Sequence, residues 1–378
     1  WNVHFDAWLR NRGFRASSSD PCLYGLQVGG KQCWISIYVD DCLIIGDSAL
    51  CSMLKRQLAA DYRVRDYGTP DTFLGMEFRR TDSGDITISQ SQYILSMAKR
   101  FDLIDQPTVS TPLPHNVLLS GRNKDEEAAD GSLYRSIIGS LLYASTSTRP
   151  DVSFAVKELA RFMMDPSAMH MMIAKRVVSY LLHTHSAGIT YSHSAASAEL
   201  HGYSDADWAS AFDRKSTSGY VFMASGGAVS WGARQQKTVA HSSAESEYVA
   251  LSLAGRECLW LTRLHSELVG VSASVPTVIY EDNQACALWT QNPIHHSRQK
   301  HIDICHHAIR DWVADKRIIV RYVRSADQLA DLFTKGLPAE QHAKLMHFIM
   351  GNATEILQKL QGCSEELPAN LLRTGQSV

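Results

Sequence analysis

The order of strand-like and helix-like segments after residue 199 constrains the fold of this chain more than any other feature. Three short strand-like runs come first, and segments of helical and strand periodicity then alternate. Three strands followed by such an alternation predict one mixed sheet with helices packed on it. We expect strands at residues 199–206, 218–225, 227–233, 277–283 and 318–324, and helices at 243–268, 284–290, 301–315 and from about 328.

The length of the chain predicts two or three domains, because 378 residues are too many for one ordinary hydrophobic core. Residues 106–132 contain three prolines and an acidic cluster, and residues 185–198 are small and polar, so both segments are predicted to be connections. The sequence predicts helices and two hairpins before the first connection, and helices between the two. The predicted fold class is therefore a multidomain combination of α/β and α+β parts.

Composition narrows the class of protein. With 45% hydrophobic and 20% charged residues, the chain has the composition of a soluble globular protein, and its net charge of −2 restricts any nucleic-acid surface to local basic patches. No run of 18 apolar residues is present, so no membrane contact is expected. The eight cysteines are scattered, which favours reduced thiols in the cytosol or nucleus. Because the chain begins with Trp1 and not Met, we expect it to be part of a longer protein.

Acidic side chains fall at the ends of predicted strands and at the starts of predicted helices in the last block. Carboxylates that converge from separate elements can hold two divalent cations about 3.5–4 Å apart, the arrangement that cuts phosphodiesters. Mg²⁺ suits a site made of oxygen ligands. A single aspartate is more often a solvated loop residue than a catalytic one. The prediction of a metal site therefore rests on several acids together and not on any one of them. The candidates are Asp205, Asp207, Glu245, Glu247, Asp282, Asp327 and Asp331.

Helical periodicity chooses between the two glutamates of the long predicted helix. Glu247 shares a face with Ala250 and Ala254, and this apolar face must pack on the sheet. Glu245 shares a mixed, more polar face with Ser252. We therefore predict that Glu247 is the acid held against the sheet.

A second acidic feature lies near the start of the chain, where residues 35–46 read "ISIYVDDCLIIG". Burying Asp40 and Asp41 in an apolar run would be costly unless a cation paired with them. Two strand-like runs flank the pair, so the segment predicts a hairpin with both acids at its exposed tip.

Several segments of the last block resemble the ribonuclease H domain of copia-type LTR retrotransposon Pol polyproteins. They are "SDADWAS", "DRKSTSGYVF", "VSWGARQQKTVAHSSAESEYVAL", "EDNQACALW", "HHSRQKHIDI" and "DQLADLFTKGL". The resemblance places the family's four metal-binding catalytic acids on Asp205, Glu247 (in the E-x-x-A pattern), Asp282 and Asp331. It implies two Mg²⁺ ions, for which Mn²⁺ substitutes, and cleavage of the RNA strand of an RNA–DNA hybrid.

The first part of the chain is similar to the C-terminal half of the same family's reverse transcriptase. The similarity rests on "GFRASSSDPCLY", "IYVDDCLIIG" and "FLGMEF", and "YRSIIGSLLYASTSTRPDVSFAV" resembles the family's thumb and tether. Asp40 and Asp41 then fall on the Y-x-D-D turn, where the family's acids bind Mg²⁺ and the incoming triphosphate. The family's palm needs a third aspartate from an upstream strand, so we expect primer extension to require an upstream Pol segment.

The resemblance also implies domain boundaries, partners and a location. It divides the chain into a palm fragment (1–105), a linker with helical thumb and tether (106–196), a ribonuclease H-like domain (197–338), and a C-terminal helix with a flexible tail (339–378). The implied partners are the RNA–DNA hybrid, an RNA template, a DNA primer, the upstream Pol segment and further copies of the chain. The implied location is a cytoplasmic virus-like particle or the nucleus.

Three other interpretations compete with this one. A decayed or repurposed element would bind nucleic acid without cutting it. A related integrase or transposase nuclease would carry its glutamate last, whereas here the glutamate comes second. A zinc site among the histidines at 295–307 lacks a familiar four-ligand spacing.

Overall fold

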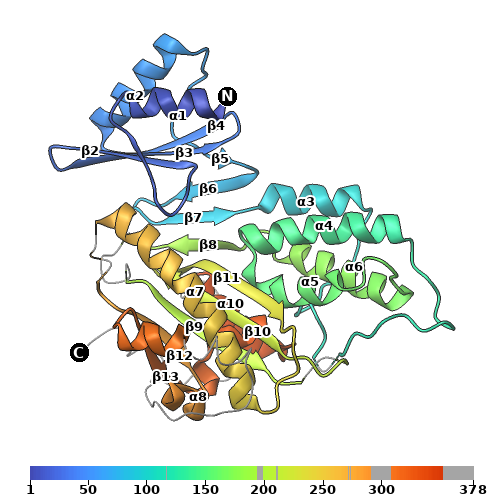
Figure 1. Cartoon of the computed structure of the whole chain (residues 1–378). Helices are drawn as coiled ribbons and strands as arrows, with labels where there is room; N and C mark the ends of the chain where they lie inside the picture. Colours follow the sequence, from blue (N-terminus) through green and yellow to red (C-terminus); the bar gives the residue numbers. More distant parts are fainter. Residues whose placement is uncertain are drawn as a thin grey trace.

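The computed structural model describes residues 1–115, 117–193, 199–209, 212–270, 272, 274–290 and 308–351. Three sheets, of four, four and five strands, run through these residues. An N-terminal unit stands at one end of the molecule, and helices and the five-stranded sheet form the body (Figure 1). The predicted combination of α/β and α+β parts is confirmed.

The N-terminal unit packs two helices on the first sheet. Helix α1 (Asn2–Arg10) and helix α2 (Ser48–Asp61) bury Phe5, Leu9 and Leu54 against Ile35 of that sheet. The hairpin predicted around the acidic pair is present, and two further strands precede it. The strands are β1 (Arg15–Ala16), β2 (Leu23–Val28), β3 (Lys31–Tyr38) and β4 (Asp41–Gly46).

The second sheet joins segments that are far apart in the sequence. Its strands are β5 (Thr72–Phe73), β6 (Met76–Arg80), β7 (Ile86–Ser89) and β8 (Gly188–Tyr191). The second of the two predicted hairpins is formed by β6 and β7, which are joined by a turn at Ser83-Gly84 with Gly84 at φ +90°. The prediction that residues 185–198 form only a connection is wrong, because β8 lies within them and Ile189 pairs with Ile88. Four residues with a distant partner leave too little local periodicity to predict a strand.

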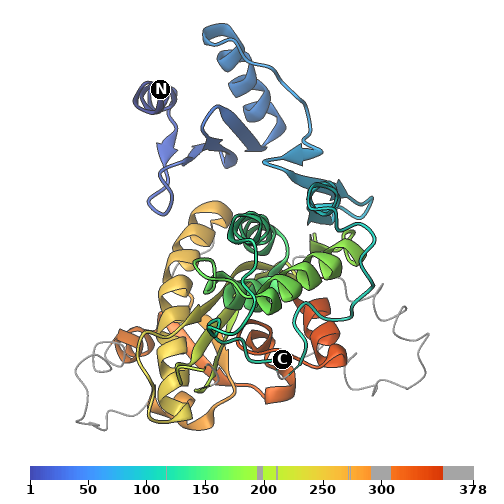
Figure 2. The same ribbon diagram turned by 90° about the vertical axis from the view of Figure 1, so that its right-hand side faces the viewer.

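A layer of helices packs on the five-stranded sheet and beside the second sheet, and the helices after residue 132 were predicted. It consists of α3 (Ser91–Arg100), α4 (Gly131–Ser147), the 3-10 turn η1 (Pro150–Val152), α5 (Ser153–Ala160) and α6 (Ala168–His183). The two sheets also contact each other directly, because the Tyr191 hydroxyl of β8 donates to the Ala228 carbonyl at 2.7 Å. The apolar stripe of Val152, Val156 and Leu159 is fully buried. Figure 2 shows the N-terminal unit standing above this body, and the Trp260 indole donates to the Ser19 carbonyl at 2.9 Å.

The third sheet is mixed, as predicted. Strand β9 (His201–Asp207) lies at its centre, antiparallel to β10 and parallel to β12. The other strands are β10 (Thr217–Ala224), β11 (Gly227–Gln235), β12 (Thr277–Glu281) and β13 (Ile318–Tyr322), in the order β11-β10-β9-β12-β13. The long helix α7 (Ser243–Val269) covers one face, and α8 (Gln284–Trp289) follows β12.

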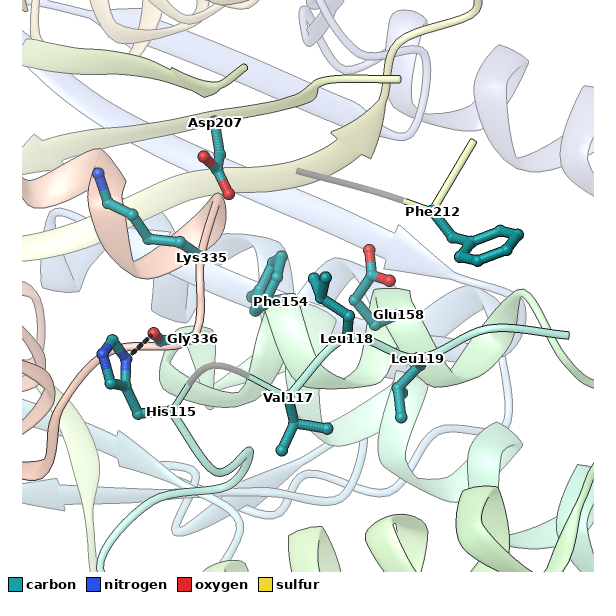
Figure 3. Close-up of a pocket in the computed structure, with 10 residues that line it drawn as sticks. All are labelled: His115, Val117, Leu118, Leu119, Phe154, Glu158, Asp207, Phe212, Lys335 and Gly336. Carbon is teal, nitrogen blue, oxygen red and sulfur yellow. Dashed lines mark hydrogen bonds between the residues drawn. The ribbon is translucent and has the colours of Figure 1, made fainter. Parts of the chain in front are cut away.

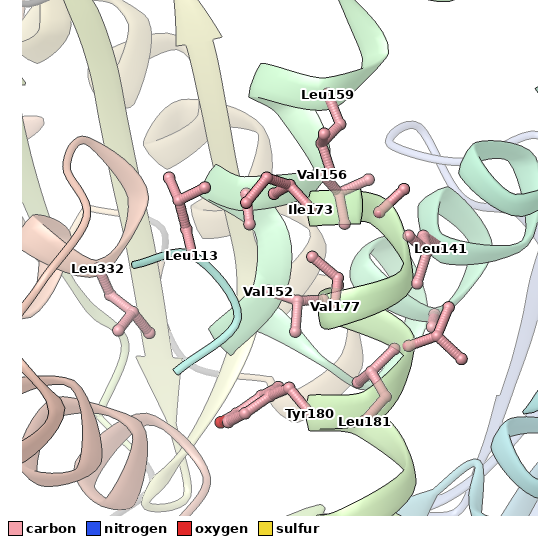
Figure 4. Close-up of a cluster of buried hydrophobic side chains, with 14 of the residues drawn as sticks. Leu113, Leu141, Val152, Val156, Leu159, Ile173, Val177, Tyr180, Leu181 and Leu332 are labelled. Atoms are coloured by element: carbon pink, nitrogen blue, oxygen red, sulfur yellow. The ribbon is translucent and has the colours of Figure 1, made fainter. Parts of the chain in front are cut away.

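The other face of this sheet packs on the helical layer. One hydrophobic cluster includes Val221 and Met223 of β10 together with residues of α4, α5 and α6. In Figure 4, Leu332 and Leu113 approach the helix that carries Val177 and Tyr180. The core is therefore continuous across residue 197, the boundary that the sequence suggested.

The C-terminal part differs from its prediction. A helix beginning near residue 328 is wrong: short 3-10 turns η3 (Ser325–Asp327) and η4 (Leu329–Phe333) come first, and α10 (Ala339–Ile349) follows. Gly336 and Pro338 separate them, because proline cannot continue a helix from its N-terminal side. In the part of the chain that the structure describes, no helix has the length and apolar character needed to span a lipid bilayer.

Candidate metal centre

The centre begins at the adjacent ends of two parallel strands. Ser204 of β9 pairs with Glu281 of β12, so the next residues, Asp205 and Asp282, are neighbours beyond that pair. The carboxyl ends of parallel strands meet at one edge of a sheet, and this brings together acids that are 77 positions apart (282 − 205).

A first carboxylate group joins Asp205, Asp282 and Asp331, whose ligand oxygens all lie within 4.8 Å of one another. Asp331 comes from η4, which is tied to β9 because the Gln328 amide donates to the Ser204 carbonyl at 2.8 Å. Gly219, the partner of Asp205 in β10, permits this packing: a Cβ there would lie 2.7 Å from Thr334 Cγ2. The missing side chain lets η4 press on the sheet and bring Asp331 to the strand end.

A second carboxylate group joins Glu247, Glu281 and Asp282, again with oxygens within 4.8 Å. Glu247 faces the sheet and is only 6% exposed, as helical periodicity predicted. Glu245 instead lies at the start of α7, where its carboxylate accepts a hydrogen bond from the His241 amide at 2.9 Å. The sequence-based candidates omitted Glu281, although its period-two spacing from buried Ile279 marks it as facing inward.

Lys335 neutralises the first group. Its ammonium lies 2.7 Å from Asp331 Oδ1 and 3.8 Å from Asp205 Oδ2, and the Thr334 hydroxyl donates to Asp205. Burial raises the pKa of Asp205, and burial together with the charge of Asp205 raises the pKa of Asp331 to about 8. Burial alone would lower the pKa of Lys335, but the two carboxylates outweigh it and raise that pKa.

The second group has no such neutralising partner. Burial, and then the neighbouring carboxylates, raise the pKa of Glu247 and of Glu281 well above the usual value. Oxygen Oε2 of each is buried without a hydrogen-bond partner. Among the described residues, no basic side chain forms an ion pair with Glu247, Glu281 or Asp282. A buried, unpaired carboxylate is costly, so this donor set is compatible with a divalent cation.

The remaining candidate acids of the sheet lie outside both groups. Asp207 lines a cavity of about 260 Å³ beside the centre, with Lys335, Leu118 and Phe212 on its walls (Figure 3). The His115 imidazole closes one side by donating to the Gly336 carbonyl at 2.8 Å. Residues 117–119 therefore line the same cavity as Lys335, which contacts Asp205 and Asp331. Asp327 is held instead by Arg324 at 2.6 Å and Lys344 at 3.5 Å.

The acidic pair of the N-terminal unit lies at the tip of its hairpin, as predicted. Tyr38 pairs with Asp41, and Val39 and Asp40 form the turn. Both aspartates are exposed, and Val39 has φ +54°, a left-handed conformation that a β-branched residue rarely adopts. Within the described ranges, neither aspartate belongs to a group of three or more possible metal ligands.

Other predicted features of the last block have mixed outcomes. The histidine-rich segment 291–307 lies outside the described residues. The sequence favours a core position for Trp208, Trp231 and Trp289, but the Trp208 side chain is 48% exposed and its indole donates to the Ala240 carbonyl at 3.0 Å. Trp231 and Trp289 are partly buried against hydrophobic clusters.

Comparisons with known proteins identify relatives of this chain. Residues 1–115 match the family described as reverse transcriptase (RNA-dependent DNA polymerase). The chain is 38% identical over 342 residues to the retrovirus-related Pol polyprotein from transposon RE1 of Arabidopsis thaliana, covering 89% of this chain and 23% of that protein. It is 32% identical over 255 residues to the putative transposon Ty5-1 protein of Saccharomyces cerevisiae, covering 67% of this chain and 82% of that protein.

The matched plant Pol polyproteins are much longer than this chain, which spans 23% to 26% of their length. Among solved structures, RNase H1 from Halobacterium salinarum NRC-1 is similar over 36% of this chain and 94% of that chain, with 16% identity and a TM-score of 0.27.

Proposed function

The chain belongs to the family of copia-type retrotransposon Pol polyproteins, and we propose that its five-stranded sheet carries a ribonuclease H site that hydrolyses the RNA strand of an RNA–DNA hybrid. One observation carries this proposal: two groups of three carboxylates share Asp282. Two cations that share a carboxylate form the arrangement that cleaves phosphodiesters.

Each acid has a distinct position in the proposed reaction. Asp205 and Asp331 hold one side of the centre, Glu247 holds the other, and Asp282 bridges them. When bound, the cations supply an activated water and stabilise the leaving oxygen. Mg²⁺ is the proposed ion, with Mn²⁺ as a substitute, because all the ligands are oxygens. The 2′-hydroxyl groups distinguish the RNA strand from its DNA partner.

The exposed turn at Asp40 and Asp41 has a second proposed role, in polymerisation. In the full-length polyprotein, these acids would bind Mg²⁺ and the incoming triphosphate, together with a carboxylate from an upstream segment of the polyprotein. An RNA template and a DNA primer are the proposed partners of this part. The match of residues 1–115 to the reverse transcriptase family supports the assignment.

Cleavage of a hybrid with a labelled RNA strand tests the ribonuclease proposal. We expect cleavage with Mg²⁺ or Mn²⁺ and none with EDTA. Asp282→Asn should reduce the rate by at least about a hundredfold, because it weakens both carboxylate groups at once. Glu247→Gln should be similarly inactive, whereas the matched Glu245→Gln should cleave normally, since glutamine still accepts the hydrogen bond from His241.

Two results would contradict the proposal. One is full activity of Asp282→Asn with its fold verified by circular dichroism. The other is hybrid binding by the wild-type chain without any cleavage, which would favour the decayed, non-catalytic element.

A further inference from the structure

We propose that Glu281 is a fifth carboxylate ligand of the metal centre and binds, from the inner side, the cation held by Glu247 and Asp282. This inference rests on the ribonuclease function proposed above. The family resemblance implies four acids. Glu281 would be an additional ligand, and it directly precedes one of those acids, Asp282, in the chain.

The position of Glu281 restricts what its side chain can do. It is the last residue of β12 and is fully buried. Its Oε1 accepts a hydrogen bond from the Asn283 amide at 3.2 Å, which fixes the orientation of the carboxylate. Its Oε2 is also buried but has no hydrogen-bond partner. One carboxylate oxygen of each of Glu281, Glu247 and Asp282 lies within 4.8 Å of the others. A buried oxygen without a partner costs about 1–3 kcal/mol, more when charged.

A divalent cation explains this group better than the other ways of satisfying it. No basic side chain of the described residues pairs with these three acids. A proton shared between the carboxylates of Glu247 and Glu281 would give both buried oxygens a hydrogen-bond partner. It would not explain why the Asp282 carboxylate lies beside them. Asp282 is partly exposed, so a cation bound to it could also contact solvent. Mg²⁺ usually keeps water and phosphate oxygens among its ligands.

The two halves of the centre differ in how their charge is balanced. Lys335 provides a positive charge beside Asp205 and Asp331, so a cation entering that half must displace an ammonium 2.7 Å from Asp331 Oδ1. A cation entering the half with Glu281 displaces no basic side chain of the described chain. We therefore expect the cation beside Glu281 to be the more tightly bound of the two.

Glu281→Gln tests this role, because glutamine keeps the size of the side chain and can still accept from Asn283. Isothermal titration of the full chain with Mn²⁺ should show two bound ions in the wild type. In Glu281→Gln, the tighter ion should bind at least about tenfold more weakly. Without metal, the variant should melt at a higher temperature than the wild type, because one of the crowded charges is gone, and Mn²⁺ should raise its melting temperature by less. Glu245→Gln is the matched control and should behave as wild type.

The outcomes separate this inference from the proposed function. Unchanged Mn²⁺ affinities in Glu281→Gln, with a wild type that binds two ions and cleaves hybrids, overturn the role of Glu281 and leave the ribonuclease proposal standing. A wild type that neither binds Mn²⁺ nor cleaves overturns both. Loss of the tighter ion in Glu281→Gln, with the fold retained, supports the fifth ligand.

Discussion

Arg149 and Asp151 form a bidentate ion pair in which both side chains are fully buried, with Nε 2.9 Å from Oδ1 and Nη2 2.7 Å from Oδ2. The Tyr180 hydroxyl of α6 donates to the same carboxylate at 2.8 Å. His342 of α10 donates from Nε2 to the Asp151 carbonyl at 3.1 Å. This pair thus connects the turn before α5 with α6 and with the C-terminal helix.

Breaking that pair should destabilise the body of the protein strongly. Asp151→Asn leaves the Arg149 guanidinium buried without a counter-charge, and we expect a loss of about 3–5 kcal/mol in the free energy of unfolding. Urea unfolding followed by circular dichroism measures the loss. Asp165→Asn, which breaks the more exposed pair with Arg122, is the control and should cost no more than about 1 kcal/mol. If both variants lost the same free energy of unfolding, the Arg149–Asp151 pair would not be buried as the structure shows it.

The same region should respond to mild acid. Burial lowers the pKa of His342, so this imidazole stays neutral in the fold while the unfolded chain binds a proton near pH 6.5. The stability that His342 contributes is therefore complete above about pH 6.5 and is lost as pH falls below it, by at most about 1.4 kcal/mol per pH unit. Burial would raise the pKa of Asp151, but Arg149 outweighs burial and lowers it, so this carboxylate adds a loss only below about pH 4.

The difference in unfolding free energy between wild type and His342→Gln isolates this effect, because the carboxylates of the metal centre are common to both. We expect the wild-type advantage to shrink from pH 7.5 to pH 5.5. A constant difference for His342→Gln would show that the fold does not lower the pKa of this imidazole.

The continuous core predicts how the chain can be divided. Residues 197–338 alone would lack α4, α5, α6 and α10, and would expose the face of the sheet that carries Val221 and Met223. We expect that fragment to aggregate or to melt without cooperativity, and residues 84–351 to unfold in one transition by calorimetry. A cooperative, catalytically active 197–338 fragment would contradict this expectation.

Local patterns in the sequence predicted the parts of the fold that depend on one element at a time. The helical face of Glu247 follows from apolar spacing along α7, and the exposed tip at Asp40 and Asp41 follows from two flanking strand-like runs. The acids at 205 and 282 could be found because Asp205 lies near the end of β9 and Asp282 directly follows β12. In each of these cases, the spacing of apolar residues within one helix or strand determines where the side chain lies.

The features that were missed depend on pairs of elements distant in sequence. Strand β8 exists because Ile189 meets Ile88 across the second sheet. Lys335 reaches Asp205 only because η4 packs on β10, and its spacing of four residues from Asp331 was the one local signal. Periodicity says that a residue faces inward, but it does not say which charge it meets there.

The packing of η4 on β10 gives a prediction at Gly219. An alanine Cβ there would lie 2.7 Å from Thr334 Cγ2 and 2.8 Å from Phe333 Cβ, so η4 must move away and take Asp331 with it. We expect Gly219→Ala to lose about 1–3 kcal/mol of stability and most hybrid cleavage. Gly139→Ala in α4, where a Cβ meets nothing within 4 Å, is the control and should be stabilising by up to about 1 kcal/mol. Normal cleavage by Gly219→Ala would show that Asp331 is not needed at its present position.

The last prediction concerns Lys335, whose ammonium balances the negative charge of Asp205 and Asp331 in the first carboxylate group. Lys335→Met leaves Asp205 and Asp331 facing each other without that charge, so the metal-free protein should be less stable than wild type. The Lys335 side chain is 37% exposed, and we therefore expect a loss smaller than the roughly 3–5 kcal/mol of a fully buried pair.

Mg²⁺ should offset that loss, since a cation entering the variant has no ammonium to displace. The rise in melting temperature on adding Mg²⁺ should thus be larger in Lys335→Met than in wild type. Lys344→Met, which removes the more distant pair with Asp327, should leave this rise unchanged. An equal or smaller rise in Lys335→Met would mean that the lysine assists cation binding, and that it does not occupy the place of the cation.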